Sequence, residues 1–347
     1  MFMKKLTLLF VGLIGLTTIQ AQSVNDVVNT VRERITLTGY AQGGYNWDSS
    51  AEPENEFRLA RIILMGNAQI TDRINAYAMY ELCKSSLHEL WFNYKWDDAL
   101  QVKVGQMKTP FSIENPLSPT SLELVAPMAM VTDYMVCGSS PVMMPGSAGR
   151  DLGINVYGKL LDGKLSYDLA LMNGVGRNKG DDNSQKDFVA RLGVNPIKEL
   201  TLGASLIKGT GNMDVVPDGL GGWTNLAAPI GGLKHNGNFR RDRYAVGAML
   251  KTAPVNFRSE YMWGREGKSD SEGLYATGTV NNLLLKHLDL VASFDWLDNY
   301  ADQSRRYTTG LQYWFYPKCR VQVLYSRLNN DCRPDANRIE AQLQVAF

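Results

Sequence analysis

The chain has 347 residues, and its 36 Lys and Arg residues almost equal its 35 Asp and Glu residues, giving a formal net charge of +1. This balance gives no support to nucleic-acid binding, because such proteins carry a strongly basic face. Beyond the N-terminus, no segment approaches the roughly 18 consecutive apolar residues of a membrane helix, so helical spans are excluded there.

The N-terminus is typical of a secretory signal peptide. Lys4 and Lys5 precede an apolar run over residues 6–16, and Ala21 supplies the small residue that a signal peptidase needs. The apolar run is shorter than the roughly 20 residues of a transmembrane helix. We therefore expect residues 1–21 to direct export and to be cleaved off after Ala21. An uncleaved signal anchor is the alternative.

The segment that follows, residues 22–33, has a different pattern from the rest of the chain. Val24, Val27, Val28 and Val31 follow the spacing of one face of a helix. We expect a short periplasmic segment here, either a helix that contacts sister subunits or a frayed tail.

From residue 34 onward, apolar residues alternate with polar or small ones in segment after segment. Leu288, Leu290 and Phe294 share one parity, whereas Asp289 and Ser293 fall between them. A period of two places alternate side chains on opposite faces of a sheet. Repeated segments of about ten such residues are typical of transmembrane β-barrels. The sequence predicts sixteen strands, at 34–45, 57–70, 74–83, 87–96, 100–107, 150–158, 164–173, 186–194, 199–208, 243–252, 255–264, 272–281, 287–297, 306–316, 319–328 and 337–347.

The connectors between these predicted strands alternate in length. Short ones such as 71–73 hold turn residues, and longer ones such as 209–242, 265–271 and 298–305 lie between them. One short-turn rim and one long-loop rim are expected of an outer-membrane barrel. The predicted fold is therefore all-β: an antiparallel transmembrane barrel over residues 34–347, with short periplasmic turns and long extracellular loops.

The C-terminus adds a more specific feature. Ile339, Leu343, Val345 and Phe347 share one face of the last predicted strand. A terminal Phe that closes such a strand resembles the assembly signal of bacterial outer-membrane barrels. Together with the signal peptide, it places the expected barrel in the outer membrane of a Gram-negative bacterium, in contact with outer-membrane lipid.

One stretch of the chain resembles a known family. Residues 104–111 read VGQMKTPF, and Glu114 follows. This stretch resembles the GQ-K-PF-E pattern of the phosphate-selective porin O and P family. Three further runs resemble other parts of that family in the same order: FRLAR at 57–61, RDLGI at 150–154 and MNG at 172–174. The resemblance implies a sixteen-stranded, trimeric porin whose long third loop folds inward and narrows the channel.

Residues 108–149 match that constriction loop in position and length. The loop is apolar and rich in Met, which favours packing against the inner wall over exposure to water; an external lid or a trimer-contact loop is the alternative. The charged candidates for the constriction are Lys108, Glu114, Glu123 and Asp133. Anion pores need rings of Arg or Lys, and no further basic residue follows Lys108 in this loop. The sequence therefore leaves the solute open, anions such as phosphate included.

The expected function is passive diffusion of small hydrophilic solutes or ions through a water-filled barrel. We expect no catalytic residue, cofactor or metal ion. The alternatives are a structural or adhesion barrel, a subunit of an export machine, or a hydrolase using Ser86 and His88, the closest Ser–His grouping. The channel-lining candidates are the charged residues of the predicted inner face: Arg61, Lys103, Asp151, Arg191, Arg243, Arg258, Glu260, Arg306 and Glu340.

Overall fold

The structure is a computed structural model. It describes residues 33–126, 128–137, 147–212, 215–217, 223–225, 238–267, 269–299 and 302–347. The predicted signal peptide (1–21) and residues 22–32 of the predicted periplasmic segment lie outside the described residues, as do positions 127 and 138–146 of the predicted constriction loop. Among the helices of the described part, none is long and apolar enough to cross a membrane.

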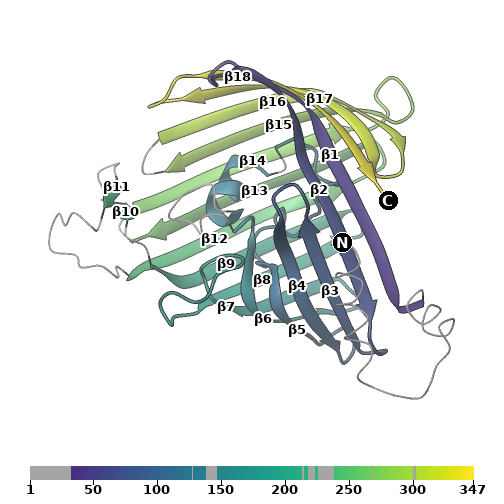
Figure 1. Ribbon diagram of the computed structural model, residues 1–347, viewed down its shortest axis with the longest axis vertical. Coiled ribbons are helices and arrows are strands. Elements are labelled where there is room, and N and C mark those ends of the chain that lie inside the picture. Colours follow the sequence, from purple (N-terminus) through teal and green to yellow (C-terminus); the bar gives the residue numbers. More distant parts are fainter. Residues whose placement is uncertain are drawn as a thin grey trace.

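Sixteen antiparallel strands close into one barrel, in which the first strand pairs with the last (Figure 1). These strands are β1 (Ile35–Asp48), β2 (Asn55–Gln69), β3 (Ile74–Glu81), β4 (Ser86–Lys95), β5 (Gln101–Lys108), β6 (Arg150–Leu160), β7 (Leu165–Met172), β8 (Asp187–Ile197), β9 (Leu200–Asn212), β12 (Asn238–Lys251), β13 (Val255–Glu266), β14 (Ser269–Val280), β15 (Leu288–Asn299), β16 (Asp302–Tyr316), β17 (Cys319–Asn330) and β18 (Ala336–Ala346). Between β9 and β12, the short strands β10 (Val215–Pro217) and β11 (Trp223–Asn225) form a separate two-stranded sheet among the described residues. The predicted all-β, sixteen-stranded barrel is confirmed.

Several strands extend further toward the extracellular rim than predicted. β12 begins at Asn238 instead of 243, and β16 begins at Asp302 instead of 306. The predicted long connectors 265–271 and 298–305 were therefore wrong, because most of their residues belong to strands. Beyond the membrane both faces of a strand meet water, so the apolar–polar alternation that marks a strand disappears. Cross-strand pairing such as Arg265 opposite Asp270 continues the ladder there.

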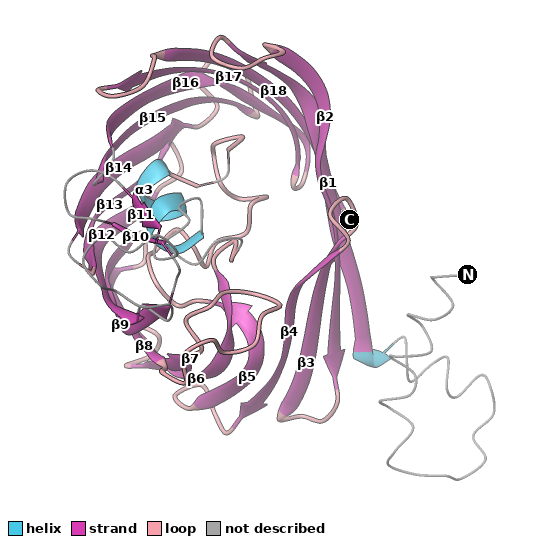
Figure 2. Ribbon diagram, turned by 60° about the vertical axis from the view of Figure 1, so that its left-hand side comes forward, coloured by secondary structure: helices cyan, strands magenta, loops and turns pink. Residues whose placement is uncertain are grey.

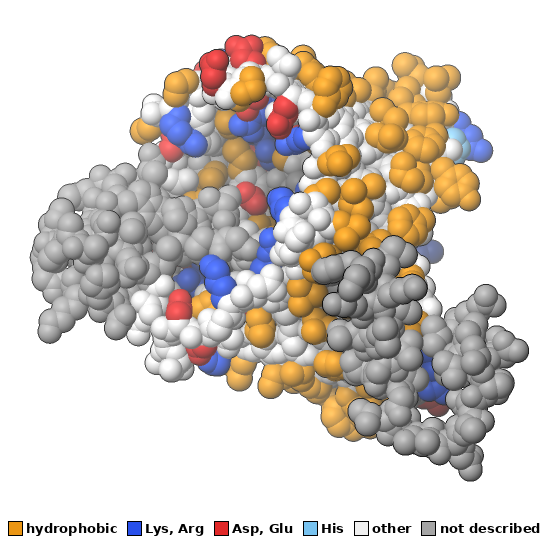
Figure 3. Space-filling model, viewed as in Figure 1, with side chains coloured by type: hydrophobic (Ala, Val, Ile, Leu, Met, Phe, Trp, Pro, Cys, Tyr) orange, Lys and Arg blue, Asp and Glu red, His pale blue; other side chains and the backbone are white. Residues whose placement is uncertain are grey.

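The apolar residues of the alternating pattern face outward, as predicted. Leu171, Val246, Leu311 and Leu343 are exposed in the single chain. Figure 3 shows apolar side chains covering much of the outside of the sheet, whereas charged side chains gather near the rim and the opening. Such an outer belt matches the hydrocarbon layer of a bilayer.

The inner face of the barrel is polar and hydrogen-bonded across strands. Gln42 Nε2 donates to Gln344 Oε1 at 2.8 Å, and the hydroxyls of Thr277 and Ser293 lie 2.7 Å apart. Most of these polar groups find partners on neighbouring strands, which satisfies them without an apolar core. The lumen wall is therefore built from side chains whose polar atoms face one another.

The seam between β1 and β18 depends on a glycine. Gly39 and Phe347 exchange two backbone hydrogen bonds of 3.0 and 2.9 Å. A Cβ atom on Gly39 would lie 2.5 Å from Phe347 Cζ and 2.7 Å from the Ile63 carbonyl oxygen. Any larger residue at position 39 must displace the terminal ring or the neighbouring strand.

Gly39→Val is therefore expected to lower the free energy of unfolding by about 1–3 kcal/mol, the usual cost of overpacking. Urea titration in detergent micelles, followed by tryptophan fluorescence, measures the change. Gly180→Val is the matched control, because a Cβ there has no atom within 4 Å. Equal unfolding midpoints for the two variants would contradict this account of the seam.

Candidate functional site

The connection between β5 and β6 enters the barrel and packs against its inner wall. It contains the short helix α3 (Met130–Thr132), which continues into a π-helical turn, Asp133–Cys137. Figure 2 shows α3 inside the barrel beside β13 and β14, and α3 contacts β14 and β15. Phe111 and Met135 are fully buried against wall residues that include Met262. The predicted inward fold of this loop is confirmed, and its apolar residues explain why it prefers the wall to water.

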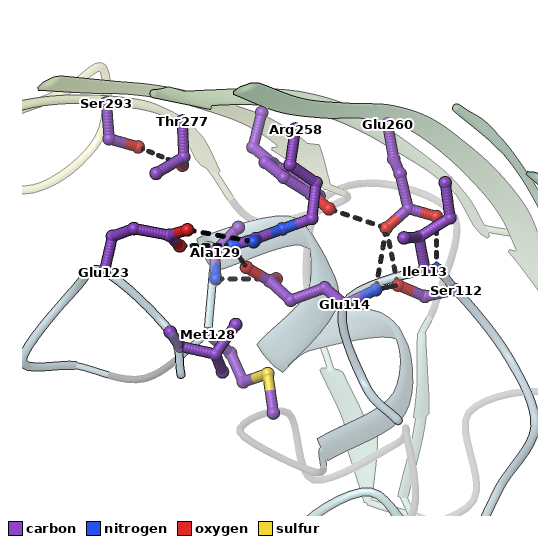
Figure 4. Close-up of polar contacts among 12 residues, drawn as sticks. Ser112, Ile113, Glu114, Glu123, Met128, Ala129, Arg258, Glu260, Thr277 and Ser293 are labelled. Atoms are coloured by element: carbon purple, nitrogen blue, oxygen red, sulfur yellow. Dashed lines mark hydrogen bonds and ion pairs between the residues drawn. The ribbon is translucent and has the colours of Figure 1, made fainter. Parts of the chain in front are cut away.

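The carboxylate of Glu260 on β13 holds the first part of the loop (Figure 4). It accepts hydrogen bonds from Ser112 Oγ at 2.6 Å, from the Ile113 and Glu114 amides at 2.7 and 3.2 Å, and from Tyr275 Oη at 2.7 Å. Four donors thus converge on one buried carboxylate. Such charge-assisted bonds are about twice as strong as neutral ones, which makes Glu260 the main anchor of this part of the loop.

Arg258, two residues earlier on the same face of β13, holds two carboxylates of the loop. Its Nη2 lies 3.0 Å from Glu114 Oε1 and 2.8 Å from Glu123 Oε2 (Figure 4). Burial raises the pKa of Glu114 to about 7, and the Arg258 guanidinium opposes that rise, as does a hydrogen bond from the Ala129 amide. Two of the three predicted acidic residues of the constriction, Glu114 and Glu123, are thus engaged by one wall arginine.

Side chains of β16, β17 and β18 bind the backbone of the same loop. Arg320 Nη2 donates to the Leu122 carbonyl at 2.5 Å, and Gln322 Nε2 donates to the Glu123 carbonyl at 2.7 Å. Gln344 Nε2 reaches the Thr120 carbonyl at 3.2 Å. Buried backbone carbonyls need such partners, so this half of the wall is built to receive the loop.

The GQ-K-PF-E stretch forms the root of the loop. Gly105 has φ +132°, and a Cβ there would lie 2.8 Å from Trp91 Cα, so the position requires glycine. Gln106 Nε2 donates to the His88 carbonyl at 2.9 Å. Lys108 Nζ donates to the carbonyls of Asn115 and Leu117 at 2.8 and 2.6 Å. The residues of this pattern therefore have a structural role, because they fix how the chain turns into the barrel.

Two of the three other resembling runs, at 150–154 and 172–174, meet at the extracellular mouth. Asp151 Oδ2 accepts a hydrogen bond from the Gly174 amide at 2.6 Å. Arg241 Nη1 donates to the Gly174 carbonyl at 2.6 Å and lies 3.2 Å from Asp187 Oδ2. The Thr210 amide donates to Asp187 Oδ1 at 3.0 Å. This buried network ties the loop after β7 to β6, β8, β9 and β12.

The predicted channel-lining residues fall into two groups. Arg61, Lys103 and Arg191 are partly exposed on the inner wall. The other six are buried, and four of them form ion pairs. Besides Arg258, these are Arg306 with Asp295 at 2.6 Å, Arg243 with Glu266 at 2.9 Å, and Glu340 with Arg58 at 3.2 Å. Glu260 lies under the loop and Asp151 at the mouth. Asp133 opens the π-helical turn, where its amide donates to the Ala129 carbonyl at 2.8 Å.

Sequence reasoning missed Arg58, which faces the lumen together with Arg61. Two residues, Leu59 and Ala60, lie between them, so strict alternation places the two arginines on opposite faces. A β-bulge in the β1–β2 ladder shifts the register between Gln42 and Gly43 and brings both arginines to the inner face. The adjacent Gly43 and Gly44 are the sequence signal that could have indicated the bulge.

Ser86 and His88, the Ser–His grouping considered for a hydrolase, contact other residues and not each other in the described interactions. His88 Nε2 lies 3.1 Å from Glu81 Oε2, and Ser86 Oγ accepts a hydrogen bond from Asn178 Nδ2 at 3.3 Å. A nucleophile needs its base within hydrogen-bond reach. The described contacts of these two residues therefore serve strand and loop packing.

A closed sixteen-stranded barrel with an apolar outside, a polar lumen and a loop docked within it defines a porin, a passive outer-membrane channel. The chain belongs to the phosphate-selective porin O and P family, whose model matches residues 35–282. The family and the fold are those of a non-enzymatic channel of Gram-negative outer membranes.

Solved structures with low sequence identity share this fold. The anion-selective porin from Comamonas acidovorans has a TM-score of 0.65 at 9% identity, with 90% of this chain and 99% of that chain covered. Salmonella typhi OmpF in complex with daunomycin gives 0.63 at 13% identity, covering 90% and 97%. The trimer form of in-vitro folded OmpT from Vibrio cholerae gives 0.61 at 10% identity, covering 90% and 99%. A comparison with curated protein sequences gave no match.

Proposed function

We propose that the protein is exported by cleavage after Ala21, assembles as a homotrimer, and passes small hydrophilic solutes with a preference for anions. The signal-peptide pattern supports the first statement. The trimeric form of the structurally similar OmpT supports the second. The docked loop narrows the lumen in this proposal, and the remaining wall, on β1–β8, forms the diffusion path.

The observation that carries the anion preference is an asymmetry within the lumen ion pairs. The side chain of Arg58 is 37% exposed and that of its partner Glu340 11%. Arg191 is 29% exposed and Asp168 11%. Arg338 and Asp48 repeat the pattern at 35% and 10%. At these three pairs a solute meets the guanidinium before the carboxylate; the deeper pairs Arg150–Glu89 (6% and 11%) and Arg258–Glu123 (5% and 15%) have the reverse order.

Further residues strengthen the same asymmetry. Arg61 and Lys103 are partly exposed on this wall, and neither forms an ion pair with another described residue. Two of the three acidic residues of the loop are paired with the wall, since Glu114 and Glu123 both lie within ion-pair distance of Arg258. Exposed cations without nearby exposed carboxylates concentrate anions in a narrow water-filled path.

The double variant Arg58→Gln/Arg61→Gln tests this charge preference. In planar bilayers under a tenfold KCl gradient, we expect the wild-type reversal potential to have the sign of anion preference. The double variant should move it toward zero, because it removes two exposed positive charges from the path. Lys198→Gln is the control, since this exposed residue lies in the β8–β9 turn. A wild-type potential at or beyond zero toward cation preference would refute the proposal, and absence of conductance would favour a structural barrel.

A further inference from the structure

One cation of the lumen wall has surroundings unlike the others. Lys103 lies on β5 opposite Asn93 of β4 and Asn155 of β6. Its Nζ lies 4.3 Å from the ring centroid of Trp91 and 5.0 Å from that of Tyr157. Trp91 lies opposite Gly105, two residues from Lys103 toward the extracellular side, and Tyr157 lies opposite Gln101, two residues toward the periplasm. The ammonium therefore sits between two rings on a partly exposed stretch of wall.

No carboxylate compensates this ammonium directly. Within the described part of the chain, Lys103 forms no hydrogen bond and no ion pair. The nearby carboxylates are paired with other cations, because Glu89 Oε1 lies 3.1 Å from Arg150 and Asp168 lies 2.7 Å from Arg191. The second oxygen of Glu89 accepts a hydrogen bond from Trp91 Nε1 at 3.3 Å. An ammonium has three donors and no acceptor, and aromatic faces stabilise its charge without accepting conventional hydrogen bonds.

The neutral groups around Lys103 do not change this charge balance. Tyr157 Oη lies 3.0 Å from Asn93 Oδ1 and 3.1 Å from Gln101 Oε1, and these two oxygens share its one proton. Asn155 Nδ2 donates to Asp168 Oδ1 at 2.9 Å, and its own Oδ1 is buried without a partner. An amide oxygen could accept a hydrogen bond from the ammonium but carries no charge. Lys103, Arg191 and Asp168 together leave one uncompensated positive charge.

The chemistry of this place selects among anions. One uncompensated cation matches a monoanion, whereas a phosphate dianion needs at least two. A carboxylate accepts charge-assisted hydrogen bonds from Lys103, and an apolar body attached to it can contact the edges of the Trp91 and Tyr157 rings. A fully hydrated inorganic anion gains nothing from such contact and must shed water to reach the ammonium.

We propose that Lys103, Trp91 and Tyr157 form a lumen subsite for small organic monoanions, namely carboxylates that carry an apolar body. The subsite rests on the proposed function, since it takes the inner wall of β4–β6 to line the diffusion path. The subsite extends the proposed function, because its three residues define which class of anion it binds.

Benzoate and inorganic phosphate, added at constant ionic strength to a channel conducting chloride, provide the test. Benzoate is expected to lower the wild-type conductance in a saturable way and at lower concentration than phosphate does. In Lys103→Met, the benzoate concentration that gives half of the maximal effect should rise about tenfold or more, because one charge-assisted hydrogen bond is lost. Tyr157→Leu keeps the charge and should weaken the benzoate effect without changing that of phosphate. Lys198→Met is the matched control.

The outcomes separate this proposal from the charge preference of the whole lumen. Equal effects of benzoate and phosphate on the wild type, or a benzoate effect that survives in Lys103→Met, would overturn the subsite. A KCl reversal potential without anion preference would overturn the proposed function, and a Lys103-dependent benzoate effect would still support the subsite. Heat-dependent electrophoretic mobility verifies that each variant is folded, and Lys103→Gln replaces Lys103→Met if the latter fails to fold.

Discussion

Arg258→Met is expected to release the inner loop from the wall. The substitution leaves the buried Glu114 and Glu260 and the partly buried Glu123 close together, without the cation that pairs with Glu114 and Glu123. Removing one partner of a buried pair costs about 3–5 kcal/mol. A loss of 3 kcal/mol weakens loop docking by more than about 100-fold. Single-channel recordings should show larger and noisier conductance than the wild type.

A thiol inside the loop gives an independent measurement of this release. Burial raises the pKa of Cys137, so the docked loop should react slowly with maleimides, which attack the thiolate. In a Cys83→Ser/Cys332→Ser background, which removes the two exposed cysteines, Arg258→Met should speed Cys137 labelling. Arg265→Met is the matched control, because the Arg265–Asp270 pair is exposed at the rim. Equal labelling rates for the two variants would show that Arg258 does not hold the loop.

Asp187→Asn is expected to destabilise the extracellular mouth. The side chain of Asp187 is fully buried and lies 3.2 Å from Arg241. It packs closely against Gly174, where a Cβ atom would lie 2.7 Å from Asp187 Oδ1. The substitution keeps the shape but leaves the buried Arg241 without its ion-pair partner. The expected loss is about 3–5 kcal/mol of the free energy of unfolding, measured by urea titration in detergent micelles.

The control for this variant is Asp331→Asn, which removes an exposed ion pair with Arg305. Exposed pairs contribute roughly 0–1 kcal/mol, so the control midpoint should stay close to that of the wild type. If the two midpoints agree, the mouth network contributes little to stability, and the RD-G and NG runs need another explanation.

Much of the fold could be predicted because the geometry of a transmembrane barrel imposes a pattern on residues that are close together in the sequence. Each membrane-crossing segment tends to alternate apolar and polar residues, as Leu288 to Phe294 do except at Val291, which packs in an inner cluster with Leu124 and Val125 of the loop. All sixteen strands follow from this rule, together with the outward faces and the alternation of rims. The rule fails where its cause ends: outside the hydrocarbon layer, as at the start of β12 and β16, alternation no longer marks a strand.

The candidate site could be predicted only as a set of residues. The sequence named Arg258, Glu260, Glu114 and Glu123 as charged lumen or loop residues, but the partner of each lies more than a hundred positions away or across a register that no local pattern fixes. The same holds for Lys103, whose aromatic neighbours come from strands β4 and β6. The presence of a charged residue in the sequence does not show whether its side chain is exposed to solute or buried in an ion pair.

The sequence by itself thus determined that this chain is an alternating, barrel-forming polypeptide with a long apolar third loop, because each of these features depends on residues close together in the chain. Only the tertiary structure decided which charges are buried and which remain exposed. Docking of the loop pairs Glu114 and Glu123 with Arg258, and the bulge at Gln42 and Gly43 turns Arg58 inward beside Arg61. Burial and pairing arise from contacts between distant segments, and these contacts set the charge that a solute meets.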